Sequence, residues 1–309
     1  MTEIIVGVDA GGSKTHVIVA SSTGEVLAAV TGPGAAMAPG DAAHCADIIV
    51  PLIDQALAMA EQTQYRPRIV FAGVAGTGRE EEQMALQRAL VEREIAEEVV
   101  VETDAAVALA DAFGEGAGIV LLSGTGSIAF GRGPTGVYAR CGGWGLVFGD
   151  EGSGAWIGRR ALSVVAAAED GREPETALAG AILTAAQVNE AAQLIPWAIA
   201  AGKETLAALA PSVMAVAMQG DLRANAIIDM AAEELMLHVR ALGKRLFVDE
   251  RAEFSVALAG GLLAKGSLLR KRVEQRIKRA VPGAAVKAGD VNGAQGAVTM
   301  AMQNLALRG

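Results

Sequence analysis

Runs of β-branched and other apolar residues, separated by short glycine turns, open the chain. Ile4–Val8 and Thr15–Ser21 are two such runs, joined by the turn Asp9–Lys14, and Val26–Val30 is a third run after the turn Thr23-Gly24. Runs of this length and composition between turn residues predict β-strands. The first thirty residues therefore predict three strands connected by two tight turns.

Longer segments then place apolar residues at helical spacing and alternate with further strands. The spacing predicts helices over Asp41–Gln62 and Glu80–Ile95, and strands over Arg68–Val74 and Val99–Val101. The predicted order of this half of the chain is β-β-β-α-β-α-β.

The pattern starts again at residue 118. It predicts a strand over Ile119–Leu122, a glycine turn at Ser123–Ser127, a second strand to Phe130, a turn at Thr135-Gly136 and a third strand near Val137–Ala139. The first half has the same order of strand, glycine turn, strand, Thr-Gly turn and strand. We interpret this as an internal duplication of one supersecondary unit that has diverged in sequence.

The second half differs from the first by an Ala-, Leu- and Met-rich segment with helical periodicity, Gly154–Arg251, which predicts a helical insertion. After it, the pattern predicts in order a strand, a basic helix, a short strand and a terminal helix: Phe254–Ala259, Lys265–Arg279, Ala285–Lys287 and a helix from about Ala294. No Ser- or Pro-rich linker separates the halves, so we expect two closely packed α/β lobes with a cleft between them. The expected lobes are residues 1–115, onto which the terminal helix 294–309 packs, and residues 116–293.

Composition and charge narrow the function classes. The chain has 309 residues, of which 52% are apolar, so it can bury a sizeable core. Its net charge is −9 and only 4% of its residues are aromatic, which argues against a nucleic-acid partner. The longest charge-free windows, such as Gly116–Gly131, are shorter than the roughly 20 residues of a membrane span, and no secretory signal is visible. We therefore expect a soluble, cytoplasmic protein without a membrane partner.

The metal-binding residue types are sparse. Cys45 and Cys141 lie far apart, and the histidines, His16, His44 and His238, share no ligand-like interval. This argues against a zinc or iron–sulfur site and is typical of a cytosolic redox setting.

Two glycine turns, Asp9–Thr15 and Ser123–Ser127, occupy the same place in the two repeats. Successive backbone N–H groups of such a hairpin form an anion cradle, because the missing Cβ lets the backbone approach an oxygen closely. Each turn alone is compatible with an ordinary hairpin, and Lys14 with a solvated turn lysine. Their matched positions and their hydroxyl groups favour two phosphate clamps, with contacts from Gly11, Gly12, Ser13, Lys14, Thr15, Gly124, Thr125 and Gly126.

Two nucleotide motifs fail on closer reading. Gly7–Thr15 nearly matches the P-loop pattern, but Ser13 stands between Gly12 and Lys14, and a strand follows instead of a helix. Gly131–Gly136 satisfies GxGxxG, but Pro134 and the strand after it exclude the helix N-terminus of a Rossmann site.

Two carboxylates stand at strand ends. Asp9 ends the first strand, where it can hold Mg²⁺ through water beside phosphates or close an Asx-turn. Asp104 stands where a strand stops and a helix begins, the position of an N-cap. If the lobes close over it, its carboxylate can accept the proton of an attacking hydroxyl group.

Two further stretches suit a sugar and a nucleoside. Cys141–Gly145 and Gly149–Gly154 form a polar, glycine-dense loop in which Asp150 and Glu151 can accept sugar hydroxyls and Trp144 offers a flat face. The alternative is a connecting loop whose end starts the next helix. Gly260-Gly261, after a strand, would let the backbone approach adenine or serve only as a tight exit from the strand.

An ordered set of motifs resembles the N-acetylglucosamine kinase family, which belongs to the sugar kinase, Hsp70-type chaperone and actin superfamily and includes the BadF/BadG/BcrA/BcrD ATPases. The motifs, spread over nearly the whole chain, are DAGGSKT (Asp9–Thr15), TDAA (Thr103–Ala106), SGTGS (Ser123–Ser127), CGGWG (Cys141–Gly145), GDEGSG (Gly149–Gly154), AGGLL (Ala259–Leu263) and AQGA (Ala294–Ala297).

The resemblance implies two ribonuclease-H-like (actin-like ATPase) lobes and an ATP-dependent kinase acting on the 6-hydroxyl of an amino sugar. It implies that Asp104 is the base and that Asp9 is the carboxylate on the Mg²⁺ side. It implies that Gly12, Thr125 and Gly126 contact the phosphates and that Gly260 and Gly261 lie on the adenosine side. It also implies a sugar pocket that contains Cys141, Gly143, Trp144 and Asp150.

Two departures from the family pattern leave the sugar open. The family's usual Asn after the third strand is absent from Gly32–Met37, and a Ser of some members is Ala75 here. N-acetylglucosamine, glucosamine and related amino sugars all remain candidates, with Glu151 as a hypothetical partner for the ammonium of glucosamine.

Two other classes compete with a kinase. An activase-type ATPase of the BadF/BcrA kind holds an iron–sulfur cluster at a dimer interface, for which only Cys45 and Cys141 are available. A sugar-sensing regulator needs a DNA-binding helix-turn-helix, whereas this chain begins with the first strand. The helical insertion offers a dimer face, so we expect a homodimer.

Overall fold

The computed structural model describes residues 3–247 and 252–307. The chain divides into two compact units: unit 1 comprises Met1–Gly116 with Val291–Gly309, and unit 2 comprises Ala117–Asp290. The end of the predicted insertion, residues 248–251, lies outside the described residues. Each unit is built around its own five-stranded sheet.

Unit 1 contains a mixed sheet with the strand order β3-β2-β1-β4-β5. The strands are β1 (Ile4–Ala10), β2 (Lys14–Ser21), β3 (Val26–Pro33), β4 (Ile69–Val74) and β5 (Glu98–Thr103). β1, β2 and β3 pair antiparallel, whereas β1, β4 and β5 run parallel. Asp9 pairs with Gly73, and Gly73 pairs with Glu102, so the carboxyl ends of the parallel strands lie at one edge.

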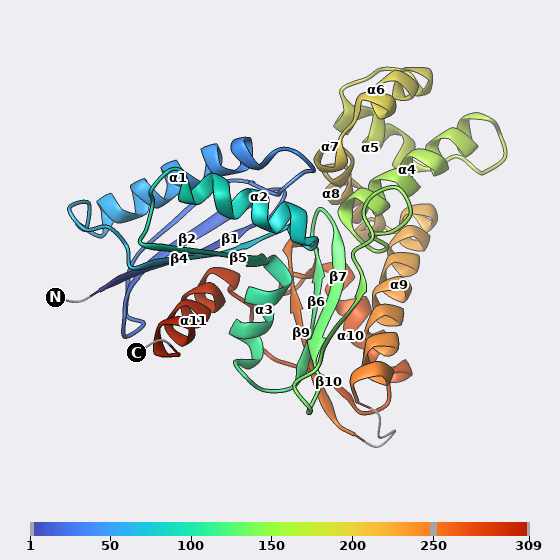
Figure 1. Cartoon of the computed structure of the whole chain (residues 1–309). Coiled ribbons are helices and arrows are strands. Elements are labelled where there is room, and N and C mark those ends of the chain that lie inside the picture. The colour runs from blue at the N-terminus through green and yellow to red at the C-terminus, as the bar shows by residue number, and fades with distance from the viewer. Residues whose placement is uncertain (1–2, 248–251, 308–309) are drawn as a thin grey trace. The chain divides into compact units, whose positions relative to one another are not determined.

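Helices cover both faces of this sheet (Figure 1). α1 (Ala42–Met59) and α2 (Glu80–Val91) pack on one face, in a cluster that includes Ile49 and Leu86. α3 (Asp104–Phe113) and α11 (Gly293–Ala306) pack on the other face, in a cluster that includes Val107 and Ala297. Because both faces are covered, β1 is a nearly continuous apolar run instead of an alternating one.

The core also accounts for two apolar helical segments. α1, with a hydropathy of 1.3 over 18 residues, is long and apolar enough to cross a membrane, as is the bent pair Lys203–Met218 with Leu222–Leu246. This resemblance to a membrane span is one of length and composition only. The apolar side chains of α1 pack in the core of unit 1, and those of the bent pair pack in the core of unit 2.

Unit 2 repeats the strand order of unit 1 as β8-β7-β6-β9-β10. Its strands are β6 (Gly118–Ser123), β7 (Ser127–Arg132), β8 (Tyr138–Gly142), β9 (Phe254–Ala259) and β10 (Ala284–Val286). β6, β7 and β8 pair antiparallel, and β6, β9 and β10 run parallel. The same order and the same strand directions in both units confirm the predicted internal duplication.

The segment between β8 and β9 is helical, as predicted. Its helices are α4 (Gly154–Glu169), α5 (Ala177–Ala186), α6 (Leu194–Ala200), α7 (Lys203–Ala207), α8 (Ala210–Met218) and α9 (Leu222–Leu246), with a 3₁₀ turn at Ala191–Gln193. The basic helix that follows β9 is α10 (Leu268–Ala280), and it packs along α9.

Several predicted boundaries differ from the structure; the helix predicted over Glu80–Ile95, for example, ends at Val91. The helix predicted from Lys265 begins at Leu268, because the Ser267 hydroxyl accepts a hydrogen bond from the amide of Arg270. Asp104 is not the N-cap of α3: Thr103 takes that place, its hydroxyl accepting from Ala106 N at 3.1 Å, and Asp104 is the first helical residue. The third strand of unit 2 extends to Gly142, so Cys141 lies in β8 and not in the following loop.

Candidate functional site

The β1–β2 hairpin of unit 1 holds the first predicted phosphate clamp. Gly11 N donates to Lys14 O at 2.9 Å and closes the turn, which leaves Ser13 and Lys14 exposed and Gly11 and Gly12 half-buried. Thr15 differs from its neighbours, because it is completely buried and its hydroxyl has no hydrogen-bond partner among the described residues. The accessible part of the hairpin therefore runs from Gly11 to Lys14.

Asp9 and Asp104 lie at the edge of the unit 1 sheet where the parallel strands end. Burial, and then the charge of Asp104, raise the pKa of Asp9 to about 7, while Lys14 opposes this shift. Asp104 is partly exposed at the start of α3, where its Oδ1 accepts from Ala105 N at 2.9 Å. A buried carboxylate that is raised in pKa by burial and by a neighbouring negative charge is a position at which a nearby cation is favourable.

These two carboxylates fit Mg²⁺ better than a metal held entirely by protein. Among residues 3–247 and 252–307, no group of three or more His, Cys, Asp or Glu side chains could hold a metal ion. Mg²⁺ is usually bound through one or two carboxylates together with waters and substrate phosphates. Asp9, at the end of the strand that leads into the predicted phosphate hairpin, has the donor chemistry for that arrangement.

The N-terminus of α11 completes the surroundings of Asp9, and the sequence motifs did not reveal it. A Cβ at Gly293 would lie 2.5 Å from Asp9 Oδ2, so the carboxylate packs directly on the first residue of this helix. Asn292 caps the helix, and its backbone amide donates to Asp111 at 2.8 Å. Burial lowers the pKa of His16, and a side-chain hydrogen bond with Asn292 partly offsets this shift. The Asn-Gly pair before an apolar helix was the available signal.

The β6–β7 hairpin of unit 2 holds the second predicted clamp. It packs on the N-terminus of α4: Gly154 N donates to Gly124 O at 2.8 Å, and Ala155 N donates to Thr125 O at 3.3 Å. Two hydroxyls tie the hairpin to the loop before α4, since Ser123 Oγ donates to Gly152 O and Ser127 Oγ to Glu151 O. The hairpin and the loop Gly149–Ser153 therefore form one hydrogen-bonded body.

The two glycines after β9 lie against the same hairpin. Gly260 has φ +90°, and a Cβ at this position would collide with the backbone of Ser123. Gly124 lies close to Gly261 N, which a Cβ on Gly124 would approach to 3.9 Å. The structure thus brings together in unit 2 the second predicted phosphate hairpin and the two glycines predicted for adenosine.

The predicted sugar residues lie around the loop before α4. Asp150 is buried in the left-handed region at φ +56°, which is uncommon for a residue with a side chain. Glu151 is partly exposed, and its Oε2 lies 3.6 Å from Nε2 of His238 on α9. Gly143 also has a positive φ, and Cys141 is half-buried in β8 with its pKa raised by burial.

Trp144 is an exposed indole with two side chains beside it. It is 59% exposed, and the guanidinium of Arg140 lies 4.5 Å from the ring centroid. Phe148 stands tilted beside it with 6.2 Å between the ring centroids. An exposed indole held by a cation is suited to packing against a flat apolar sugar face.

Comparisons with known proteins agree with this architecture. Residues 6–301 match the model of the BadF/BadG/BcrA/BcrD ATPase family. The chain is 31% identical over 261 residues to the N-acetylmuramic acid/N-acetylglucosamine kinase of Clostridium acetobutylicum, covering 84% of this chain and 85% of that protein. It is 28% identical over 315 residues to the N-acetyl-D-glucosamine kinase of Dictyostelium discoideum, covering 98% of each.

A solved structure shares the fold. The crystal structure of a candidate N-acetylglucosamine kinase from Chromobacterium violaceum superimposes with a TM-score of 0.81 at 29% identity, covering 96% of this chain and 98% of that one. This likeness and the two equivalent sheets confirm the predicted α/β fold of two actin-like ATPase lobes.

Proposed function

Because the chain belongs to the BadF/BadG/BcrA/BcrD ATPase family, we propose that it is an ATP-dependent kinase that phosphorylates the 6-hydroxyl of an amino sugar, N-acetylglucosamine or glucosamine. The observation that carries the proposal is the hydrogen-bonded body of unit 2, in which the glycine hairpin and the loop with Asp150 and Glu151 are tied together. The names of the two relatives, both kinases of N-acetylated amino sugars, support the acceptor class.

The proposed reaction gives a role to each of the predicted site residues. Asp104 accepts the proton of the sugar hydroxyl while the hydroxyl oxygen forms a bond to the γ-phosphorus. The bond between that phosphorus and the β,γ-bridging oxygen breaks, and ADP leaves. The hairpin amides hold the phosphates, Gly260 and Gly261 lie on the adenosine side, and Trp144, Asp150 and Glu151 hold the sugar. Gly143 and Cys141 line the same region.

Asp9 is proposed to hold Mg²⁺ through water. The ion, when bound, would neutralise charge on the nucleotide phosphates. The carboxylate of Asp9 is suited to this role because burial and Asp104 make its own negative charge costly without a cation.

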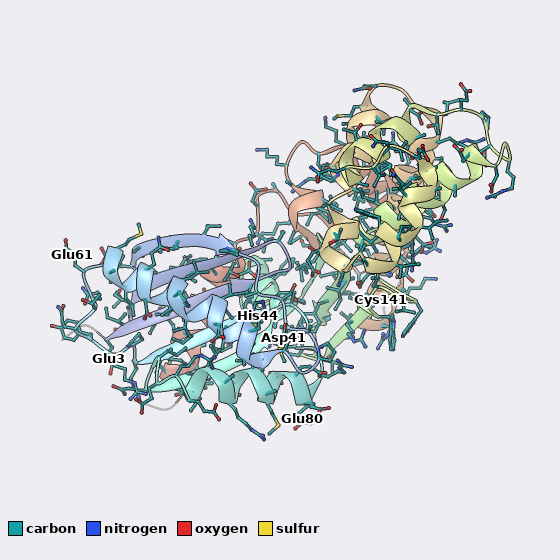
Figure 2. All side chains as sticks on the ribbon, turned by 90° about the horizontal axis from the view of Figure 1, so that it is seen from above. Glu3, Asp41, His44, Glu61, Glu80 and Cys141 are labelled. Atoms are coloured by element: carbon teal, nitrogen blue, oxygen red, sulfur yellow. The ribbon has the colours of Figure 1, made fainter. Side chains whose placement is uncertain are left out.

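The alternative, an ATPase activator subunit with an iron–sulfur cluster, is less well supported by the cysteines. Cys45 is buried in α1, and its Sγ donates to Ala35 O at 3.0 Å. Asp41 and His44, which are labelled in Figure 2, mark the start of this helix. Burial raises the pKa of Cys45 to about 12, and Asp41 adds to the shift, whereas a cluster ligand must be a thiolate. Iron in the purified protein would favour this alternative.

ADP release with ATP and a panel of acceptors tests the proposed function. The panel comprises N-acetylglucosamine, glucosamine, N-acetylmuramic acid, N-acetylmannosamine and glucose. We expect turnover to depend on sugar and to be fastest with an amino sugar. ADP release that no sugar stimulates would contradict a sugar kinase.

A further inference from the structure

Lys203 is the first residue of α7, within the helical insertion, and sequence motifs assigned it no role. Its Nζ lies 2.9 Å from Oδ2 of Asp150. The side chain of Lys203 is 36% exposed, whereas that of Asp150 is 4% exposed. Asp150 is therefore the buried partner of this ion pair, and Lys203 is the partner that solvent and a ligand can reach.

Asp150 is not saturated by this partner. Its Oδ2 is buried and lacks a hydrogen bond in the described part of the chain, although the ammonium lies within ion-pair distance. The ammonium, 2.9 Å away, compensates the charge of the Asp150 carboxylate. A buried acceptor in a strained left-handed residue is an arrangement that a ligand donor would satisfy.

The same ammonium borders the glycine hairpin. A Cβ at Gly126 would lie 2.6 Å from Lys203 Nζ and 3.2 Å from Asp150 Oδ2. A side chain at this position would have to displace the end of the lysine. The positive charge therefore lies beside both the hairpin proposed for phosphates and the carboxylate proposed for the sugar.

Close helix packing fixes the backbone of Lys203. α7 packs on α4, where Gly158 lies against the carbonyl of Leu206 and a Cβ at Gly154 would lie 3.1 Å from Cβ of Ala207. The amide of Gly154 is also the one that donates to Gly124 O. α4 therefore connects the base of α7 rigidly to the hairpin.

We propose that Lys203 binds the terminal phosphoryl group of ATP and stabilises its charge during transfer. This inference rests on the proposed function and deepens it. A phosphoryl group in transfer lies between the nucleotide and its acceptor, and the ammonium lies beside a group assigned to each. Charge on that group spreads over its equatorial oxygens, which a flexible lysine with three donors can follow.

Calorimetric binding of AMPPNP and of ADP, each with Mg²⁺, tests this directly. We expect Lys203→Met to weaken AMPPNP binding by roughly tenfold or more and ADP binding by less than about threefold, because only AMPPNP carries the terminal phosphoryl group. Lys203→Arg should retain most of the preference, and Lys278→Met, which removes an exposed lysine of α10, should change neither affinity. Equal weakening of both nucleotides, or no weakening, would overturn the proposal.

A second background separates phosphate binding from simple charge compensation. In Asp150→Asn no carboxylate needs a cation, so a lysine that only neutralises Asp150 becomes dispensable. We expect Lys203→Met to lower the AMPPNP preference in this background as well. An unchanged preference would overturn the proposal.

Turnover separates this inference from the proposed function. With the best sugar, Lys203→Met should lower kcat by about 100-fold and change the sugar KM little. If the unmodified protein phosphorylates no sugar, the proposed function fails, while the nucleotide measurements still decide whether Lys203 contacts a terminal phosphoryl group.

Discussion

The carboxylate of Asp9 lies on Gly293, the first residue of α11, although 283 positions separate them in the sequence; a Cβ at Gly293 would approach Asp9 Oδ2 to 2.5 Å. The end of β1 and the start of the C-terminal helix thus form one structure around the proposed Mg²⁺ carboxylate.

Gly293→Ala is expected to displace Asp9. The added methyl group cannot fit without moving the carboxylate, so we expect a loss of about 1–3 kcal/mol in stability and at least a tenfold loss of kcat/KM. Thermal melting and sugar-dependent ADP release measure the two effects. Gly180→Ala, in α5 where a Cβ meets open space, is the matched control and should leave activity unchanged. Normal activity of Gly293→Ala would remove this contact from the site.

Asp9→Asn should change how stability depends on pH. The pKa of Asp9 is raised to about 7 in the folded protein from an ordinary value of 3.8, so its contribution is fully present below the ordinary pKa and is lost as pH rises through 7. We compare the free energy of unfolding of the variant and of the unmodified protein, both without Mg²⁺. Relative to the unmodified protein, the variant should be more stable at pH 8 than at pH 5 by on the order of 2 kcal/mol. Chemical denaturation at both pH values measures this gain. An identical difference at both would contradict a buried, uncompensated carboxylate.

Glu151→Gln is expected to discriminate among sugars. Burial lowers the pKa of His238, so the imidazole beside Glu151 is neutral at pH 7 and leaves the carboxylate charge available. Glucosamine carries an ammonium near neutral pH. Removing the negative charge of Glu151 should therefore raise the KM for glucosamine by about 10-fold or more. The KM for glucose, which has no ammonium, should change less. Equal losses on both sugars would reject this role for Glu151.

The strands and both glycine hairpins were predictable because their signals are local. Apolar runs bounded by glycine identify β1, β2, β6 and β7 in the sequence. The repeated order of strands and glycine turns predicts the repeated sheet. The start of α3 was missed by one residue, since Asp104 and Thr103 are both good caps and only the structure shows which side chain bonds the amide of Ala106.

Side chains delivered from distant elements were not predictable. Lys203 reaches Asp150 from α7, and His238 reaches Glu151 from α9. Gly293 reaches Asp9 from the far end of the chain. Periodicity places each residue on its own helix, but the packing between helices and sheet decides what it meets. No motif spans such separations.

The turnover of Asp104→Asn tests the central claim most directly. Phosphorylated sugar is measured as it forms, and calorimetry on the same protein measures nucleotide and sugar binding. We predict that both ligands bind within about threefold of their normal affinity while kcat falls by roughly 10²- to 10⁴-fold, because the amide cannot accept the hydroxyl proton. Near-normal turnover in this variant would contradict the assignment of Asp104 as the base.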